Sequence, residues 1–397
     1  MAQIAYLTDV EGQWHKLQDF VRDNALVALA GETLKVAPGA VFVFGGDAVD
    51  RGPSARRIVR TLLAAKRAQP DQVILLAGNR DINKLRLARE LQGIFFYPLP
   101  DELQSADRPA LLQWIFKFTM GAPNAFAHRK AELQTEDDQA VAQSFLDDVM
   151  PGGEHSEYLR VCQLAYRAGA TVFVHGGITN ESLGHVPGLA PIASPDAWIE
   201  ALNAWYRHQL QAFFDRVERA PSDESWNALI AYQAPSKSSR RNQASVVYGR
   251  TTDDHNNPHL PDAGTMHTLT AAGIHRIVVG HTPMGDTPSI LRASDFELVF
   301  ADNSYAPLER GTLLMLDDAL LRIRGQGQTS AKETVDVDFS LPRNNDDILI
   351  GKRDEATGLL VKGPVTDGRW LMQRFGERFA LEQEAFTETD LRKRKLI

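Results

Sequence analysis

The stretch Val41-Phe42-Val43-Phe44-Gly45 leads directly into Gly46-Asp47-Ala48-Val49-Asp50-Arg51-Gly52. A short apolar run that contains β-branched residues predicts a buried strand. Two carboxylates and an arginine therefore come just past the end of a strand. In open α/β sheets, functional sites form where the carboxyl ends of the strands meet the loops. This stretch thus predicts an α/β sheet with a charged site at its edge.

The same pattern recurs along the chain, where polar residues follow other short apolar runs. The further runs cover residues 4–7, 73–76, 171–174, 277–279 and 298–300. The polar residues that follow within four positions of a run are Asp9, Asp47, Asn79, His175 and His281. Apolar residues with helical spacing lie between the first runs, around residues 14–21 and 58–63. This alternation predicts an α/β fold of layered sheets and helices, with these polar side chains gathered at one edge.

The composition excludes several classes of protein. Lysine and arginine number 43 against 51 aspartates and glutamates, for a net charge of -8, whereas proteins that bind nucleic acid irrespective of sequence are normally basic. No stretch approaches the ~18 uninterrupted apolar residues of a membrane helix, and the first residues lack the pattern of a signal peptide. We therefore expect a cytoplasmic protein that binds neither nucleic acid nor membranes. Cys162 is the only cysteine, and its helical surroundings predict a small core residue.

The motifs together resemble a known family. Gly46–Gly52, Gly78-Asn79, Val174-His175-Gly176-Gly177 and Gly280-His281-Thr282-Pro283 match the calcineurin-like metallophosphoesterases in order and spacing. The Asp-Arg-Gly and His-Gly-Gly motifs are similar to those of the branch with the phosphoprotein phosphatases and diadenosine tetraphosphatases. The resemblance implies a β-sandwich of mixed sheets flanked by helices. It also implies an enzyme that hydrolyses phosphate esters with metal ions.

Two divalent metal ions are implied by this resemblance. Asp9 is expected to bind the first ion, and Asp47 to bridge both. The second ion is expected to be completed by Asn79, His175 and His281. This mixed set of oxygen and nitrogen ligands suits Mn, Fe or Zn, and Mn is our first expectation, with Mg as a further alternative.

Arginines are implied as the phosphate-binding groups. Arg51 is expected to hold the phosphate, because a guanidinium binds phosphate oxygens bidentately. The segment 243–250 is similar to the family stretch that supplies a second such arginine, which makes Arg250 a candidate together with Arg240 and Arg241. Asp302 follows a strand where the family often has a turn that closes the site.

The chain departs from the family pattern at two positions. Glu11 stands where the family has a metal-binding histidine, and Arg80 stands where the family has a histidine that acts as general acid with the help of Asp50. Glu11 either binds the first metal ion, which favours harder ions such as Mn or Mg, or pairs with Arg80. An Asp50–Arg80 ion pair is a further alternative. Arginine stays protonated in proteins, so Arg80 cannot be the general acid, but it can stabilise negative charge on the phosphoryl group.

We therefore predict a phosphomonoesterase that uses metal-bound hydroxide, in which Asp50, Arg51 and Arg80 are the catalytic residues. The leaving group would be protonated by water or by an unidentified acid, which predicts a preference for good leaving groups such as aryl phosphates. The substrate would be a phosphorylated protein or small molecule. A dinucleoside polyphosphate hydrolase and a catalytically impaired, phosphate-binding scaffold are the alternatives.

The chain is long enough for one large domain with insertions. We predict a catalytic domain over 1–326, with helical insertions at about 101–167 and 195–234. The segment 312–323 predicts a hairpin. From 327 to 397, short strand-like runs separated by glycine, aspartate and charged residues predict a β-rich C-terminal appendage with a basic tail.

Overall fold

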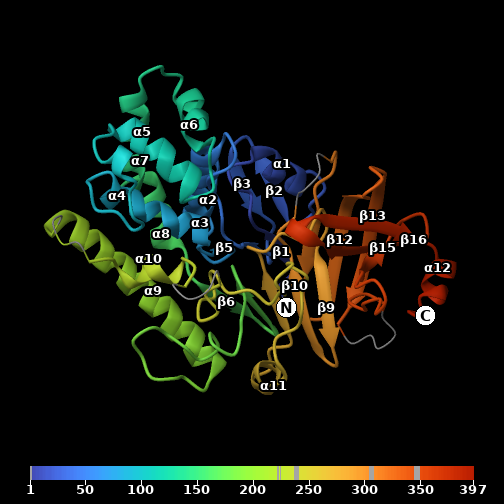
Figure 1. Ribbon diagram of the computed structural model, residues 1–397. Coiled ribbons are helices and arrows are strands. Elements are labelled where there is room, and N and C mark those ends of the chain that lie inside the picture. The colour runs from blue at the N-terminus through green and yellow to red at the C-terminus, as the bar shows by residue number, and fades with distance from the viewer. Residues whose placement is uncertain (1, 221–222, 224, 237–240, 304–307, 344–348) are drawn as a thin grey trace.

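The computed structural model describes residues 2–397 apart from 221–222, 224, 237–240, 304–307 and 344–348. Two mixed sheets form its centre (Figure 1). The first sheet contains β13 (Thr334–Pro342), β12 (Leu320–Gln328), β11 (Leu313–Leu316), β1 (Ile4–Leu7), β4 (Val41–Phe44) and β5 (Val73–Leu75), in this spatial order. The second contains β6 (Ala165–Ala168), β7 (Thr171–Val174), β8 (Arg276–Val279), β10 (Phe296–Phe300) and β9 (Ser289–Ala293).

Parallel pairing brings the carboxyl ends of the central strands level with one another. In the first sheet, β1, β4 and β5 run parallel, with Leu7 opposite Phe44 and Phe44 opposite Leu75. In the second sheet, β7, β8 and β10 run parallel, with Val279 opposite both Val174 and Phe300. The loops that follow these strands therefore start at matching heights in the two sheets.

The two sheets pack face to face. Successive side chains of a strand point to opposite faces, so each central strand contributes one set of side chains to the core between the sheets and another set to the outer face. Tyr6 and Val43 belong to the core between the sheets, where the ring of Tyr6 stacks on Phe173 of the second sheet with centroids 5.7 Å apart. Phe42 points to the other face, where its ring lies 5.7 Å from that of Phe20 in helix α1 (Trp14–Arg22). The predicted architecture of mixed sheets flanked by helices is confirmed.

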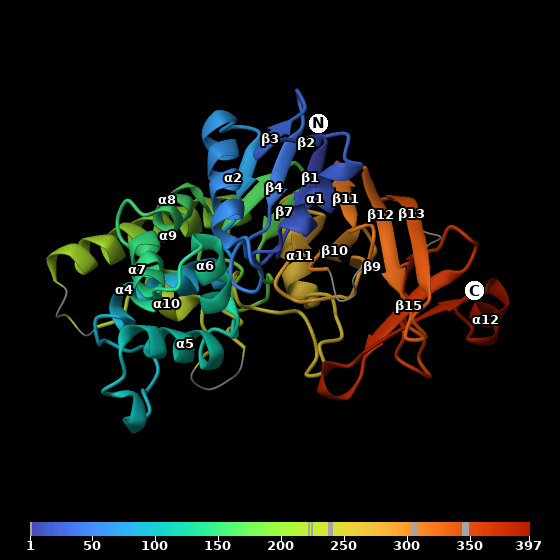
Figure 2. The same ribbon diagram turned by 90° about the horizontal axis from the view of Figure 1, so that it is seen from above.

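Helices cover the outer faces and gather at one end of the molecule (Figures 1 and 2). The first sheet is covered by α1 and α2 (Ala55–Ala68), with a small hairpin of β2 (Val27–Ala30) and β3 (Thr33–Val36) beside them. The helices after β5 are α3 (Asn79–Asn83), η1 (Lys84–Arg86), α4 (Leu87–Glu90), η2 (Asp101–Leu103), α5 (Arg108–Phe118), α6 (Ala125–Leu133), α7 (Asp138–Val149) and α8 (Glu154–Val161). Later helices are α9 (Pro195–Arg219), α10 (Ala228–Tyr232) and α11 (Ala263–Ala271). Among the described residues, no helix has the length and apolar character needed to cross a membrane.

Some details differ from the sequence-based expectation. The first helical insertion was predicted to end at about residue 167, but its last residues, 165–167, belong to the edge strand β6 (Ala165–Ala168). Strand β12 runs through position 326, where the sequence placed a domain boundary, and pairs along its whole length with β13. The apolar alternation of β12 stops after Ile323 at Gly325 and Gly327, so its continuation depends on pairing with a distant partner. Cys162 follows α8 and is buried, as expected.

The C-terminal residues form a separate three-stranded sheet at the end of the molecule opposite the helices (Figure 2). Its strands are β14 (Leu360–Pro364), β15 (Trp370–Phe375) and β16 (Leu381–Phe386), with η3 (Glu377–Phe379) between the last two and α12 (Glu388–Lys393) after them. The division of the chain into a catalytic domain and an appendage stays a prediction.

Candidate metal centre

The candidate residues lie on tight turns directly after the central strands. A positive φ, which is strained for residues other than glycine, occurs at Asp9, Glu11, Asp47, Asp50 and His281, with values of 51°, 47°, 57°, 119° and 62°. Backbone hydrogen bonds between turns hold this geometry, since the N–H of Asp9 donates to Gly46 O at 2.9 Å and that of Glu11 to Asp47 O at 2.9 Å. Strained backbone is concentrated at functional sites, and here it occurs at five candidate site residues.

Two glycines allow the turns to approach one another closely. A Cβ atom on Gly78 would lie 2.1 Å from Asp47 Oδ1, and one on Gly280 would lie 2.3 Å from Asp9 Oδ2. Any side chain at these positions would displace a candidate ligand. Close packing against Asp47 and Asp9 thus explains why the Gly-Asn and Gly-His motifs have glycine at these positions.

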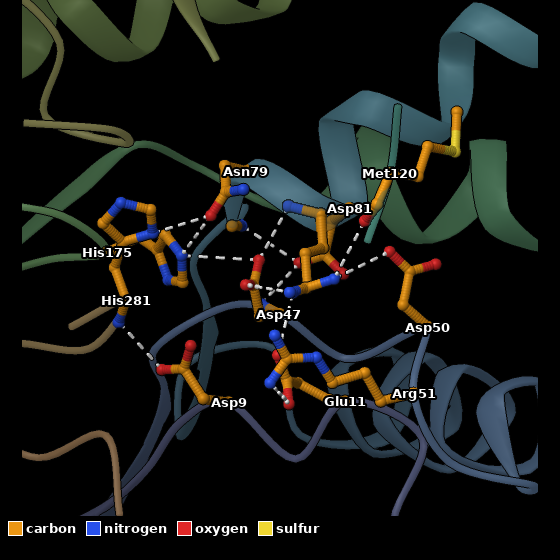
Figure 3. Close-up of polar contacts among 12 residues, drawn as sticks. Asp9, Glu11, Asp47, Asp50, Arg51, Asn79, Asp81, Met120, His175 and His281 are labelled. Carbon is orange, nitrogen blue, oxygen red and sulfur yellow. Dashed lines mark hydrogen bonds and ion pairs between the residues drawn. The ribbon is translucent and has the colours of Figure 1, made fainter. Parts of the chain in front are cut away.

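One half of the site consists of two imidazoles grouped around an amide oxygen. Asn79 Oδ1 lies 3.2 Å from His175 Nε2 and 2.7 Å from His281 Nδ1. Asp47 Oδ1 lies 3.4 Å from His175 Nε2. Figure 3 shows both histidines on the same side of Asp47, with Asn79 above Asp47 in this view. Ligand atoms of Asp47, His175 and His281 all lie within 4.8 Å of one another, which is the arrangement of a metal-binding cluster.

The hydrogen bonds of His175 test whether a metal ion fits this cluster. Its Nδ1 lies 2.8 Å from Gly45 O, and a carbonyl only accepts, so Nδ1 carries the hydrogen. In a neutral ring, Nε2 then presents a lone pair toward the oxygens of Asn79 and Asp47. Burial acts to lower the pKa of His175, but the Asp47 and Asp9 carboxylates outweigh it and raise the pKa to about 10. These carboxylates favour a positive charge at Nε2, which is supplied either by a proton on the ring or by a divalent cation that takes the place of that proton.

His281 is held in the neutral form that a metal ligand needs. Burial, followed by the charge of Arg250, lowers its pKa well below the usual value. Arg250 Nε donates to His281 Nε2 at 3.1 Å, so the second arginine expected near the phosphate does reach the centre. In the neutral ring Nδ1 then carries the hydrogen toward Asn79 Oδ1, and a metal ion bound by His281 would replace one of these two contacts. Arg241 instead donates to the backbone carbonyls of Thr252 and Asp253, and Arg240 lies outside the described residues.

The other half of the site consists of carboxylates around a guanidinium. Arg80 Nε lies 2.8 Å from Glu11 Oε1 and 3.6 Å from Asp47 Oδ2, and Nη1 lies 3.4 Å from Asp50 Oδ2. Burial acts to lower the pKa of Arg80, but these three carboxylates raise it above its usual value. Arg51 Nη1 lies 3.3 Å from Glu11 Oε2. Both ion pairs that the sequence left open for Arg80, with Glu11 and with Asp50, are therefore present together.

Two further residues of the site were not given a role from the sequence. Lys84 Nζ lies 2.6 Å from Asp50 Oδ1, so Asp50 is held between two cations. The carboxylate of Asp81 accepts the backbone N–H groups of Asp47, Ala48 and Gly78 at 2.9, 2.9 and 3.0 Å. Lys84 is four positions after Arg80, a spacing that places two helical residues on one face, and this signal was available in the sequence.

These groups open into a cavity of about 470 Å³. Among the residues that line it are Asp9, Glu11, Asp47, Asn79 and His281, the arginines Arg51, Arg80 and Arg250, the turn residue Asp302, and the aromatic residues Tyr97, Tyr248 and Phe379. Phe379 comes from the C-terminal sheet, so the appendage takes part in shaping this cavity. Three guanidinium groups beside a metal cluster make the cavity suited to a phosphate group.

The family of the chain is shown by comparison with known proteins. The family model described as calcineurin-like phosphoesterase matches residues 2–285, which is more than half of the chain. The protein therefore belongs to the calcineurin-like phosphoesterases and is a metal-dependent hydrolase of phosphate esters. The family and the enzyme class expected from the motifs are confirmed.

Solved structures with the same kind of architecture are found, although the chain matches no curated protein. It is similar to a cold-active protein-tyrosine phosphatase of a psychrophilic Shewanella species, with 17% identity, 81% of this chain and 77% of that chain covered, and a TM-score of 0.49. It is also similar to a protein serine/threonine phosphatase from Saccharomyces cerevisiae, with 14% identity, 87% and 84% covered, and a TM-score of 0.37.

Proposed function

We propose that the protein is a phosphomonoesterase that binds Mn²⁺ at Asp47, Asn79, His175 and His281. The observation that supports this most directly is the cavity lined by Asp47, Asn79 and His281 together with Arg51, Arg80 and Arg250, while His175 completes the ligand cluster from a buried position. The mixed oxygen and nitrogen ligands suit Mn, with Fe and Zn as alternatives. When bound, a divalent ion polarises a phosphate group and makes water nucleophilic near neutral pH.

The side chains of the cavity have separate roles in this proposal. Arg51, whose side chain is 52% exposed, and Arg250 bind phosphate oxygens as the substrate enters. Arg80 is fixed by its carboxylate partners and stabilises the charge that develops during transfer, which preorganised donors do most effectively. Asp50 forms ion pairs with both Arg80 and Lys84. In this way it orients Arg80, and it does not itself contact the phosphate.

The lack of a general acid for the leaving group decides which phosphate esters are hydrolysed fastest. Arg80 occupies the position of the family's general acid and remains protonated, so it donates no proton to an alkoxide. Leaving groups that are stable as anions do not need such an acid. We therefore expect aryl phosphates to be hydrolysed much faster than alkyl phosphates.

The test uses purified protein stripped with a chelator and resupplied with Mn²⁺. We expect hydrolysis of p-nitrophenyl phosphate that depends on Mn²⁺, and a loss of at least about a hundredfold in Asp47→Asn. Equal rates of hydrolysis of aryl and alkyl phosphates would contradict the proposal that no general acid protonates the leaving group. Faster cleavage of diadenosine tetraphosphate than of any monoester would favour a dinucleoside polyphosphate hydrolase. No activity with any divalent ion would favour a phosphate-binding scaffold.

A further inference from the structure

The carboxylate that replaces a family histidine has both oxygens engaged by guanidinium groups. Glu11 Oε1 lies 2.8 Å from Arg80 Nε, and Oε2 lies 3.3 Å from Arg51 Nη1. The side chains of Glu11 and Arg80 are only 14% and 15% exposed. Removing one partner of a buried ion pair is strongly unfavourable because the other charge is left uncompensated. Glu11 would have to give up such a pair in order to bind a metal ion.

Asp47 was expected to bridge two metal ions, but its two carboxylate oxygens face different groups. Oδ1 faces the histidine half, 3.4 Å from His175 Nε2. Oδ2 faces Arg80 Nε at 3.6 Å. A bridging carboxylate needs a cation on each side, and on its second side this carboxylate already has a guanidinium.

The remaining ligand expected for the first ion is also partly engaged. Asp9 Oδ2 accepts the hydroxyl of Thr8 at 2.6 Å and the N–H of His281 at 3.0 Å. Throughout the described part of the chain, the only group of three or more His, Cys, Asp or Glu side chains with ligand atoms close enough for a metal ion is Asp47, His175 and His281. Asp9 and Glu11 do not join a second group of this kind.

From these contacts we infer that the guanidinium of Arg80 takes the place of the first metal ion, so that the protein binds one divalent ion per chain. The histidine half holds this ion, and Arg80 is the permanent cation on the other side of Asp47. Three carboxylates, those of Glu11, Asp47 and Asp50, converge on Arg80. A divalent ion among them would have to sit against a positive charge that cannot be removed by deprotonation.

The replacement of a metal ion by arginine has a consequence for phosphate binding. A guanidinium presents N–H groups in a fixed plane to phosphate oxygens, whereas a metal ion binds both the phosphate and the attacking water. Arg80 can therefore provide charge stabilisation but not a nucleophile, so the activation of water would depend on the ion held by Asp47, Asn79, His175 and His281. This inference rests on the proposed metal site at Asp47, Asn79, His175 and His281, but not on the identity of the substrate.

The test is the number of metal ions per chain. Purified full-length protein is stripped, reloaded with excess Mn²⁺ and freed of unbound ion by gel filtration. Bound Mn is then counted by mass spectrometry, and a calorimetric titration with Mn²⁺ gives an independent stoichiometry. We expect one ion per chain for the wild type, one for Glu11→Gln, and none for His175→Ala.

A variant that restores the family pattern provides the complementary measurement. Glu11→His combined with Arg80→His removes the guanidinium and supplies an imidazole ligand, so we expect two ions per chain. The wild-type count decides the question even where this double variant does not fold. Two ions in the wild type, with one lost in Glu11→Gln, would overturn this inference and leave the proposed function intact. No bound ion in the wild type would overturn both.

Discussion

The two halves of the site, on either side of Asp47, carry charge in opposite ways. The histidine half presents the imidazoles of His175 and His281 and the oxygens of Asn79 and Asp47, with the guanidinium of Arg250 against His281. The guanidinium half presents Glu11 and Asp50, but already contains Arg80 between them. Figure 3 shows Glu11, Arg51 and Asp50 away from the two histidines.

This difference teaches where an external cation is needed. Buried carboxylates require a compensating charge, and the protein can provide it from its own side chains or from a bound ion. Where Arg80 and Lys84 compensate Glu11 and Asp50, no ion is required. Where His175 and Asp47 face each other, the compensating charge is either a proton on His175 or a bound metal ion, so this is the side of the site on which a metal ion can contribute.

The largest effect is expected from removing a ligand of the histidine half. In His175→Ala the ion loses a ligand and Asp47 loses its partner, so we expect no bound metal and a loss of phosphatase activity of about a thousandfold or more. Metal content and kcat/KM for p-nitrophenyl phosphate check this expectation. The matched control is His208→Ala, on the exposed face of α9, which should behave as wild type. A His175→Ala variant that retains metal and activity would show that the ion lies elsewhere.

A smaller effect is expected from a charge-conserving change in the guanidinium half. In Arg80→Lys the ammonium group is a point charge that cannot contact Glu11 and Asp50 in the same planar geometry. We expect kcat/KM to fall roughly a hundredfold, with the metal content unchanged.

Arg51→Lys serves as the control for this variant, because Arg51 is half exposed and, within the described residues, its one ion pair is with Glu11. We expect a fall of about tenfold or less, mainly through KM. An equal loss of bound metal in Arg80→Lys and His175→Ala would contradict the proposal that the histidine half alone binds the ion.

Removal of the ion should lower the stability of the fold. Binding to the native state alone stabilises a protein by about 2.7 kcal/mol at a ligand concentration of a hundred times Kd. We therefore expect a chelator to lower Tm by several degrees, since one kcal/mol corresponds to roughly 2–4 °C in a domain of this order of size. The change should vanish in His175→Ala. An identical fall in that variant would show that the chelator acts on something other than this site.

The smallest effect on the metal site and its activity is expected from the C-terminal sheet, which contacts the loop after His281. Lys362 is buried in β14, and its Nζ donates to Met284 O at 2.6 Å, to Thr287 O, and to Gln373 Oε1 at 2.7 Å. In Lys362→Met these acceptors lose their donor, which costs about 1–3 kcal/mol for each buried group left unpaired. We expect a lower Tm and a few-fold weaker affinity for Mn²⁺ by calorimetry, with little change in the selectivity between aryl and alkyl phosphates.

Lys352→Met, at an exposed position of the same region, is the control for this change. It should leave both Tm and metal affinity at wild-type values. An unchanged affinity in Lys362→Met, despite a lower Tm, would show that the C-terminal sheet stabilises the fold without positioning His281.

Much of the fold and the family could be derived from local sequence. The run Val41–Phe44 forms β4 as predicted, and β1 and β7 have the predicted bounds. These strands are short, apolar and buried on both faces, so the local pattern is sufficient. Strand β13 was not predicted, although Val335, Val337, Phe339 and Leu341 alternate with polar residues, which is the signal of a half-buried strand and was available in the sequence. The helical end of the first insertion was also misjudged at Ala165–Ala168, where pairing with β7 decides the conformation.

The sequence by itself determined the family, because the order of the motifs identifies it, and it predicted candidate site residues, because each of them comes within a few positions of the end of a strand. It also determined that Arg80 cannot donate a proton, since that is a property of the guanidinium alone. Only the tertiary structure decided between metal binding and ion pairing for Glu11. That choice depends on whether a side chain 69 positions away in sequence comes within 2.8 Å, and such a distance is set by the packing of β1, β4 and β5 in one sheet.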